Sequence, residues 1–174
     1  MPARWLTLAA TCATLAGCAN PALSAPGPNL DPLAFFTGHQ RSWGVVENRS
    51  GAPTAVITTD CRGEAEGPDG LHMVQYLTIG HDAPTRREWH MRRTGPTTYD
   101  ATANDMVGTA HGVADGRSFH WRWVLATSPG NPLLNVAMHQ WMYRMDDGSV
   151  VNRTTITKLG ITLAEVTERF APAS

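Results

Sequence analysis

The chain has 174 residues, with 14 basic and 15 acidic side chains and a formal net charge of −1 at pH 7. This length suits one domain of ordinary size. The balanced charge leaves no electrostatic footprint for a phosphate backbone, so we expect no nucleic-acid partner.

The first 17 residues have the features of a secretory signal peptide. Arg4 supplies a positive charge, and an apolar run of about a dozen residues follows from Trp5 to Ala16. This run is too short for a transmembrane helix, which needs roughly 20 apolar residues. It ends at Leu15-Ala16-Gly17-Cys18, which is similar to the lipobox at which bacterial lipoproteins are cut and acylated. The alternatives are an ordinary signal peptide and a buried N-terminal helix.

Cleavage at this motif makes Cys18 the acylated N-terminus of the mature chain. We then expect a protein of the bacterial cell envelope, anchored in the lipid bilayer through palmitate or similar chains, since two or three chains anchor a protein stably. Ala19 differs from the Asp typical of inner-membrane retention, which favours the outer membrane, with the domain facing the periplasm. Residues 18–29 are small, uncharged and rich in proline, which predicts a flexible tether to a single domain over residues 30–174.

A series of short β-strands follows, rather than long amphipathic helices. One short helical turn over residues 30–36 precedes them, with Phe35 and Phe36 placed to pack over the end of the domain. Turn-forming groups separate the strands, as at Asp115-Gly116, where glycine accepts the positive φ of a tight hairpin turn. The predicted strands are Ser42–Asn48, Thr54–Arg62, Leu71–Ile79, Arg86–Arg93, Thr98–Asn104, Met106–Val113, Ser118–Ala126, Asn135–Met145, Val150–Lys158 and Ile161–Phe170.

The connectors between these strands decide the fold class. Almost all are a few residues long, which permits hairpins but not parallel crossovers. About ten sequential antiparallel strands predict an up-and-down meander, which removes its unpaired edges best by closing into a barrel. We therefore expect an all-β fold, an antiparallel up-and-down β-barrel of about 8–10 strands of the lipocalin or calycin type. A two-sheet sandwich is the alternative.

Residues 103–125 form the most distinctive predicted hairpin. Every second residue from Phe119 to Leu125 is apolar, and three of these four are aromatic, so they share one face of a strand. Gly108, Gly112 and Gly116 recur at a spacing of four. Their polar surroundings predict strand bends or bulges rather than a helical ridge of small residues.

Landmarks spread over residues 33–170 resemble one bacterial lipoprotein family, the domain of unknown function 3833. In order, they are Phe36, Gly38, Gly44, Trp89, Asp105, Gly108, Ala110, Trp121, Trp141-Met142-Tyr143, Asn152-Arg153 and Lys158-Leu159-Gly160. The resemblance implies a lipocalin-like antiparallel barrel behind a lipobox and work related to lipids. The chain departs from the family pattern at His111, where a less polar residue is expected.

Aromatic residues on the central and late strands are the main candidates for a ligand-binding site. Small barrels can hold one ligand, and ligand pockets are lined by apolar and aromatic groups with a few polar ones. The candidate ligand-binding residues are Trp89, Tyr99, Trp121, Trp123, Trp141 and Tyr143. The alternative is that these rings fill the barrel as its core.

Asp105 and Arg153 are the polar candidates for the same site. Arg153, if it points inward, would bind a carboxylate or phosphate head group through two parallel hydrogen bonds. Asp105 precedes a glycine-containing bend, where an aspartate more often caps a turn. A third option is an ion pair between the two side chains inside the barrel.

The seven histidines do not predict a metal site from their linear spacing. No pair has the i, i+4 spacing of a zinc-hydrolase helix, and no Cys-x-x-Cys is present. We expect no cofactor, although a single histidine can hold haem, and His111 or His139 leaves that option open. Hydrolase, phosphate-loop and dinucleotide motifs are absent from the sequence.

These features predict a lipid-anchored protein that binds or carries a hydrophobic small molecule, such as a fatty acyl chain, in a barrel pocket. Binding is favoured over catalysis. The first alternative is an enzyme of isomerase, cyclase or hydratase type acting on lipid inside the barrel, with Asp105 or His139 as acid or base. The second is a structural envelope protein with a filled core and an exposed apolar patch.

Overall fold

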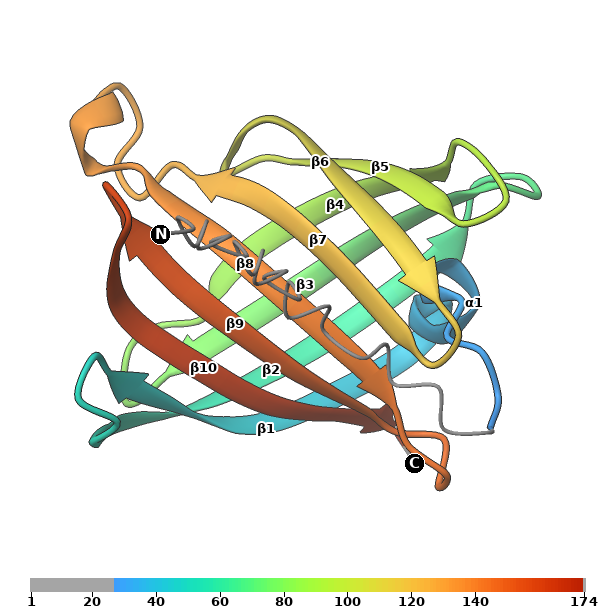
Figure 1. Ribbon diagram of the computed structural model, residues 1–174, viewed down its shortest axis with the longest axis horizontal. Coiled ribbons are helices and arrows are strands. Elements are labelled where there is room, and N and C mark those ends of the chain that lie inside the picture. Colours follow the sequence, from blue (N-terminus) through green and yellow to red (C-terminus); the bar gives the residue numbers. More distant parts are fainter. Residues whose placement is uncertain (1–26, 174) are drawn as a thin grey trace, which may run out of the picture.

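A computed structural model describes residues 27–173 (Figure 1). The expected signal peptide, the acylation site at Cys18 and most of the tether lie outside the described residues. A short helix, α1 (Pro32–Phe36), is followed by ten strands, and η1 (Pro132–Leu134) is a turn of 3-10 helix between the seventh and eighth. The strands are β1 (Gly38–Asn48), β2 (Pro53–Ala65), β3 (Gly70–Ile79), β4 (Thr85–Arg93), β5 (Thr98–Ala103), β6 (Met106–Asp115), β7 (Ser118–Leu125), β8 (Val136–Arg144), β9 (Val150–Lys158) and β10 (Ile161–Pro172).

The ten strands form one closed barrel. Each strand is antiparallel to both of its neighbours, and β1 closes the sheet by pairing with β10 as well as with β2. Since every strand has two partners, the sheet formed by the described residues has no free edge that could pair with another chain. The predicted all-β, antiparallel up-and-down barrel is confirmed.

The strand boundaries lie within a few residues of the predicted ones, with one larger difference at the start of the barrel. β1 begins at Gly38 rather than Ser42. Gly38 adopts a φ of 93°, which turns the chain from α1 straight into the strand. His39 and Gln40 then pair with Arg62 and Cys61 of β2. No separate connector lies between the end of α1 and the start of β1. In the sequence, the first residues of β1 therefore look like a loop.

Helix α1 lies at one end of the barrel (Figure 1). The Asp31 carboxylate caps its N-terminus by accepting hydrogen bonds from two backbone N–H groups of the first turn. Phe36 packs edge-on against Phe170 of β10, with ring centroids 5.6 Å apart. Gly63 of β2 permits this approach, since a Cβ there would lie 2.0 Å from the Phe36 carbonyl oxygen. α1 therefore seals this end with aromatic side chains.

The hairpin turns divide between the two ends of the barrel. The end that holds α1 also carries the β2–β3, β4–β5, β6–β7 and β8–β9 turns. The opposite end, called the distal end below, carries the other five turns, including the β5–β6 turn with Asp105. Among residues 27–173, no helix is long and apolar enough to cross a membrane.

The β6–β7 hairpin shows how glycine and aromatic residues position the barrel interior. The pairing of β6 with β7 shifts register between Val107 and His111, which confirms the bulge predicted near Gly108. Gly112 has a different role. A Cβ at Gly112 would lie 2.4 Å from the Phe119 ring, so the missing side chain makes room for that ring. The absence of a side chain at Gly112 of β6 therefore leaves space inside the barrel for the large Phe119 ring of β7.

Candidate ligand-binding cavity

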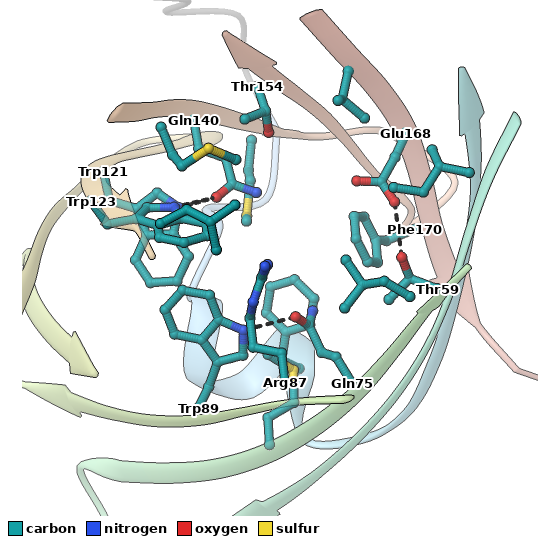
Figure 2. A pocket seen from close by; sticks show the side chains of 18 of the residues that line it. Thr59, Gln75, Arg87, Trp89, Trp121, Trp123, Gln140, Thr154, Glu168 and Phe170 are labelled. Atoms are coloured by element: carbon teal, nitrogen blue, oxygen red, sulfur yellow. Dashed lines mark hydrogen bonds between the residues drawn. The ribbon is translucent and has the colours of Figure 1, made fainter. Parts of the chain in front are cut away.

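The interior of the barrel is hollow. It contains a cavity of about 150 Å³ (Figure 2). Four methionines, Met73, Met91, Met138 and Met142, contribute to an apolar lining. Methionine is flexible and polarizable, so this lining can adapt to the shape of a ligand. The polar side chains of the lining are Thr59, Gln75, Arg87, Gln140, Thr154 and Glu168.

Three tryptophans form one wall of the cavity. Trp89 comes from β4, and Trp121 and Trp123 come from β7. The Trp89 and Trp121 rings stack with centroids 4.9 Å apart, while Trp89 meets Trp123 edge-on at 5.2 Å. All three are at most 5% exposed. The aromatic wall predicted from the period-two pattern of β7 is therefore present and is extended by a ring from β4.

Two glutamines fix the orientation of these rings. Gln140 accepts hydrogen bonds through Oε1 from the indole N–H groups of Trp121, at 2.6 Å, and Trp123, at 3.2 Å. Gln75 accepts in the same way from Trp89, at 2.7 Å. Because an indole N–H can only donate, each amide must present its oxygen to the ring. The amide nitrogen of Gln140 is thereby turned toward the cavity as a donor (Figure 2).

Arg87 is a cation inside the barrel, paired at the distal end. Its Nε donates to both carboxylate oxygens of Asp105, at 2.9 and 2.8 Å, and its Nη2 lies 2.8 Å from Asp105 Oδ2. The guanidinium carbon lies 4.9 Å from the centroid of the Trp123 ring. A cation over a tryptophan face is attracted by the ring electrons, most strongly where water is excluded. Ion pair and ring together hold the guanidinium against the wall of the cavity.

Glu168 of β10 is a buried acid facing the same cavity and is 6% exposed. Its Oε1 accepts hydrogen bonds from Ser42, at 2.7 Å, and Thr59, at 3.0 Å, and Asn152 Nδ2 donates to Oε2 at 3.3 Å. Burial raises the pKa of Glu168, and these hydrogen bonds and the nearby Arg87 charge only partly oppose the shift. The protonated form is therefore favoured relative to a glutamate in water.

The amide of Asn152 lies beside Glu168. Asn152 is fully buried, and its Nδ2 donates to Thr154 Oγ1 and to Glu168 Oε2, each at 3.3 Å. Its Oδ1 has no hydrogen-bond partner among the described residues. A buried acceptor without a donor costs about 1–3 kcal/mol.

Three of the predicted ligand-binding residues line the cavity, and two others lie close to its ends. Trp89, Trp121 and Trp123 form its aromatic wall. Tyr99 points inward and is 2% exposed, but it lies toward α1, where its hydroxyl accepts a hydrogen bond from Arg93 at 2.7 Å. Asp105 reaches the interior only through its ion pair with Arg87.

The expectation that Trp141, Tyr143 and Arg153 line the interior is wrong. Trp141 is 40% exposed on the outside of β8, stacked on His120 at 4.2 Å and on Tyr143 at 6.1 Å. Arg153 points outward from β9 and pairs with Glu165 of β10 at 2.6 Å. The proposed Asp105–Arg153 ion pair is also absent, since each has a different partner.

The alternation on β8 explains this error. Met138, Gln140 and Met142 point inward, so the aromatic residues between them must face outward. A prediction that treats aromatic residues as buried and glutamine as exposed assigns the wrong face of this strand to the barrel interior. Hydrogen bonds from Trp121 and Trp123 make Gln140 an interior residue.

The two histidines considered for haem lie outside the cavity. His111 is on the outer face of β6, with a side chain 76% exposed, 2.7 Å from Asp100. His139 lies between the inward-facing Met138 and Gln140 on β8, so it faces outward. Neither ring is placed to ligate a haem inside the barrel, and His139 is not placed for acid or base chemistry there.

Arg87, Glu168, Gln75 and Gln140 were not predicted as site residues. Each occupies an inward position of its strand, two residues from an apolar cavity residue: Gln75 from Met73, Arg87 from Trp89, Gln140 from Met138 and Glu168 from Phe170. A charged or amide residue in register with the apolar face of a strand is the signal that could have found them. Recognising it requires the inward face to be known first.

Solved structures of other proteins share this fold. The S-type phycobiliprotein lyase CPES from Guillardia theta superimposes with a TM-score of 0.60 at 8% identity, over 82% of this chain and 90% of that one. Rv2717c from M. tuberculosis superimposes with a TM-score of 0.59 at 12% identity, over 83% of this chain and 99% of that one. At these identities the likeness shows the fold alone.

The curated proteins contain no match to the chain. The sequence profile of the family described as "Protein of unknown function (DUF3833)" matches residues 12–171, which is nearly the whole chain. The resemblance seen in the sequence landmarks is thereby confirmed, and the protein belongs to the DUF3833 family.

Proposed function

We propose that the protein binds a hydrophobic small molecule, such as a fatty acid or another lipid with an acyl chain, in the barrel cavity. The observation that carries this proposal is an apolar cavity with an aromatic wall and a few convergent polar groups, the usual composition of a ligand site. A structural envelope protein would have no use for a hollow interior lined by Arg87 and Glu168. Each of these side chains costs folding free energy when it is buried.

The polar groups of the cavity select one end of the ligand. Gln140 presents amide N–H groups, and a protonated Glu168 can donate its hydroxyl proton. The guanidinium of Arg87 adds a positive charge that Asp105 balances at the distal end. Groups that donate hydrogen bonds recognise an acceptor, so the ligand carries a carboxylate or carbonyl oxygen at the end that reaches them.

The N-terminal region supports a location for the protein beside a membrane. Acylation of Cys18 would anchor the chain in the bacterial outer membrane, and a tether would hold the barrel in the periplasm beside the bilayer. A protein that takes up acyl chains benefits from this position, because the ligand is sparingly soluble in water and concentrated in the membrane. The family resemblance to lipid-related lipoproteins agrees with this assignment.

A second function is favoured by one observation, the buried carboxyl of Glu168. A titratable group with a pKa shifted by burial, facing a cavity, is a typical general acid. The protein would then be an isomerase, cyclase or hydratase of its lipid ligand, with Glu168 in the role that the sequence suggested for Asp105 or His139. A ligand recovered chemically unchanged supports binding alone, and a ligand recovered as an isomer or hydrate supports catalysis.

Titration with dodecanoate, followed by intrinsic tryptophan fluorescence, should give a saturable change at one ligand per chain. Trp89, Trp121 and Trp123 line the cavity, so their emission reports its occupancy. 1-Dodecanol should bind at least about tenfold more weakly, since it lacks the carboxylate that charged donors recognise, and tenfold corresponds to about 1.4 kcal/mol. A Trp141→Phe variant is the matched control, because its indole lies outside the barrel and its loss should leave the affinity unchanged. Non-saturable responses to both probes would count against the proposal.

A further inference from the structure

We propose that the outer face of the barrel carries a binding site for a divalent transition-metal ion of the zinc type, formed by His72, Glu88 and His90. One ligand atom from each of these residues lies within 4.8 Å of the other two. The site lies on the side of β3 and β4 that faces away from the cavity. It is therefore independent of the proposed lipid binding.

The register of two neighbouring strands brings the three side chains together. His72 of β3 lies directly opposite His90 of β4, and their rings are nearly parallel, with centroids 4.7 Å apart. Glu88 lies two residues before His90 on the same face of β4, and its Oε1 is 2.7 Å from His72 Nε2. The linear spacings used to search the sequence for zinc sites do not contain such a pair, because it forms across strands.

The donor set fits a borderline metal ion. Two imidazoles and one carboxylate are ligands that zinc takes, whereas magnesium and calcium prefer oxygen alone. Two ligand atoms on one tetrahedral zinc lie about 3.3 Å apart, as the usual zinc–ligand distances of about 2.0–2.1 Å require. Small side-chain rotations would shorten the observed separations, all within 4.8 Å, to this value. Water would complete the coordination shell.

Both positive and negative side chains surround the three proposed ligands and affect how strongly the site would attract a cation. Arg86 and His72 contact the Glu88 carboxylate through different oxygens. Arg86 lies 2.8 Å from Oε2, which leaves Oε1 directed toward His72. Its positive charge opposes a bound metal. Glu66, 3.5 Å from His90 Nδ1, and Glu64, opposite His72 in the β2–β3 pairing, supply compensating negative charge.

The stacked imidazoles and a neighbouring carboxylate position the ligand atoms of the proposed site. The two rings stack with centroids 4.7 Å apart, which holds both imidazoles next to each other on the outer face of the sheet. A carboxylate next to a ligating histidine fixes its ring orientation, and Glu66 is placed to do this for His90. Metal binding displaces protons from its histidine ligands, so zinc affinity should fall as the pH is lowered.

Isothermal titration of the full-length, tag-free protein with zinc sulfate at pH 7.5 tests this site. We expect one zinc ion per chain, with no binding of magnesium under the same conditions. A His90→Ala variant should lose at least tenfold in zinc affinity, and Glu88→Gln should also weaken binding. His90 is exposed, so its replacement should leave the barrel folded, as circular dichroism would verify.

The matched control is His111→Ala, an exposed histidine beside Asp100 on the same outer surface but outside the cluster. It should bind zinc as the unmodified chain does. Equal zinc affinity in His90→Ala and the unmodified protein would overturn the assignment, as would the absence of any saturable zinc binding.

Discussion

Replacement of Trp121 by alanine is expected to lower the free energy of unfolding by about 3–5 kcal/mol, the usual cost of removing a large buried aromatic side chain. Trp121 is 3% exposed, stacks on Trp89 and donates a hydrogen bond to Gln140. The same replacement at Trp141 should cost about 1 kcal/mol or less, because that ring is 40% exposed and loses only its stacking on His120 and Tyr143.

Urea denaturation followed by circular dichroism measures both free energies on the same scale. The two variants remove the same side chain from adjacent strands, so their difference reports which face of the sheet points inward. Trp121→Phe provides a milder second substitution if Trp121→Ala fails to fold. Equal losses at positions 121 and 141, or a larger loss at 141, would show that the inward and outward faces of β8 have been assigned the wrong way round.

Glu168 is expected to make the barrel less stable as the pH rises, by as much as about 1.4 kcal/mol per pH unit over the affected range. Its folded-state pKa is raised above the ordinary value of 4.5 by burial. Between 4.5 and the folded-state pKa, the folded chain holds a proton that the unfolded chain has released. Raising the pH through this window therefore favours unfolding, and below 4.5 the effect is absent.

A Glu168→Gln variant should abolish this pH dependence. Glutamine is neutral and nearly the same shape, and the Ser42 and Thr59 hydroxyls can donate to its amide oxygen. The difference in unfolding free energy between variant and unmodified protein should grow from pH 4.5 upward and level off above the folded-state pKa. Glu165→Gln, on the outer face of β10, is the control and should not remove the slope. Parallel stability curves for the unmodified protein and Glu168→Gln would mean that Glu168 is ionised when buried.

The fold was predictable from local signals that do not depend on one another. Period-two alternation located the strands, and short connectors such as Asp115-Gly116 required each strand to pair with the next. Closure of the sheet into a barrel could then be predicted, because a long open meander would expose unpaired strand edges. The position where this reasoning failed, the start of β1 at Gly38, is one where no connector separates helix from strand.

The candidate site was predictable only in part, because it depends on which face of each strand points inward. On β7 every second residue is apolar, and the assignment of Trp121 and Trp123 was unambiguous. On β8 the alternatives were two aromatic residues on one face and two methionines with a glutamine on the other. Composition favoured the aromatic face, but hydrogen bonds from tryptophans on β7 place Gln140 inside.

The interior charges could not be predicted for a related reason. Arg87 and Glu168 stand in stretches that also carry exposed charged residues, such as Arg86 and Arg169. Their burial is stable only because partners distant in sequence satisfy them, Asp105 for Arg87 and Ser42 for Glu168. Such pairings are properties of the closed barrel and have no counterpart in the local pattern.

Native mass spectrometry of the protein extracted from cells, without detergent exchange, tests most directly whether the barrel holds a ligand. The same sample is measured under native and denaturing conditions, so that any covalent modification contributes equally to both masses. We predict that the native mass exceeds the denatured mass by one hydrophobic small molecule that carries a carboxylate or carbonyl group. Identical native and denatured masses, from protein whose tryptophan fluorescence also fails to respond to dodecanoate, would contradict the account.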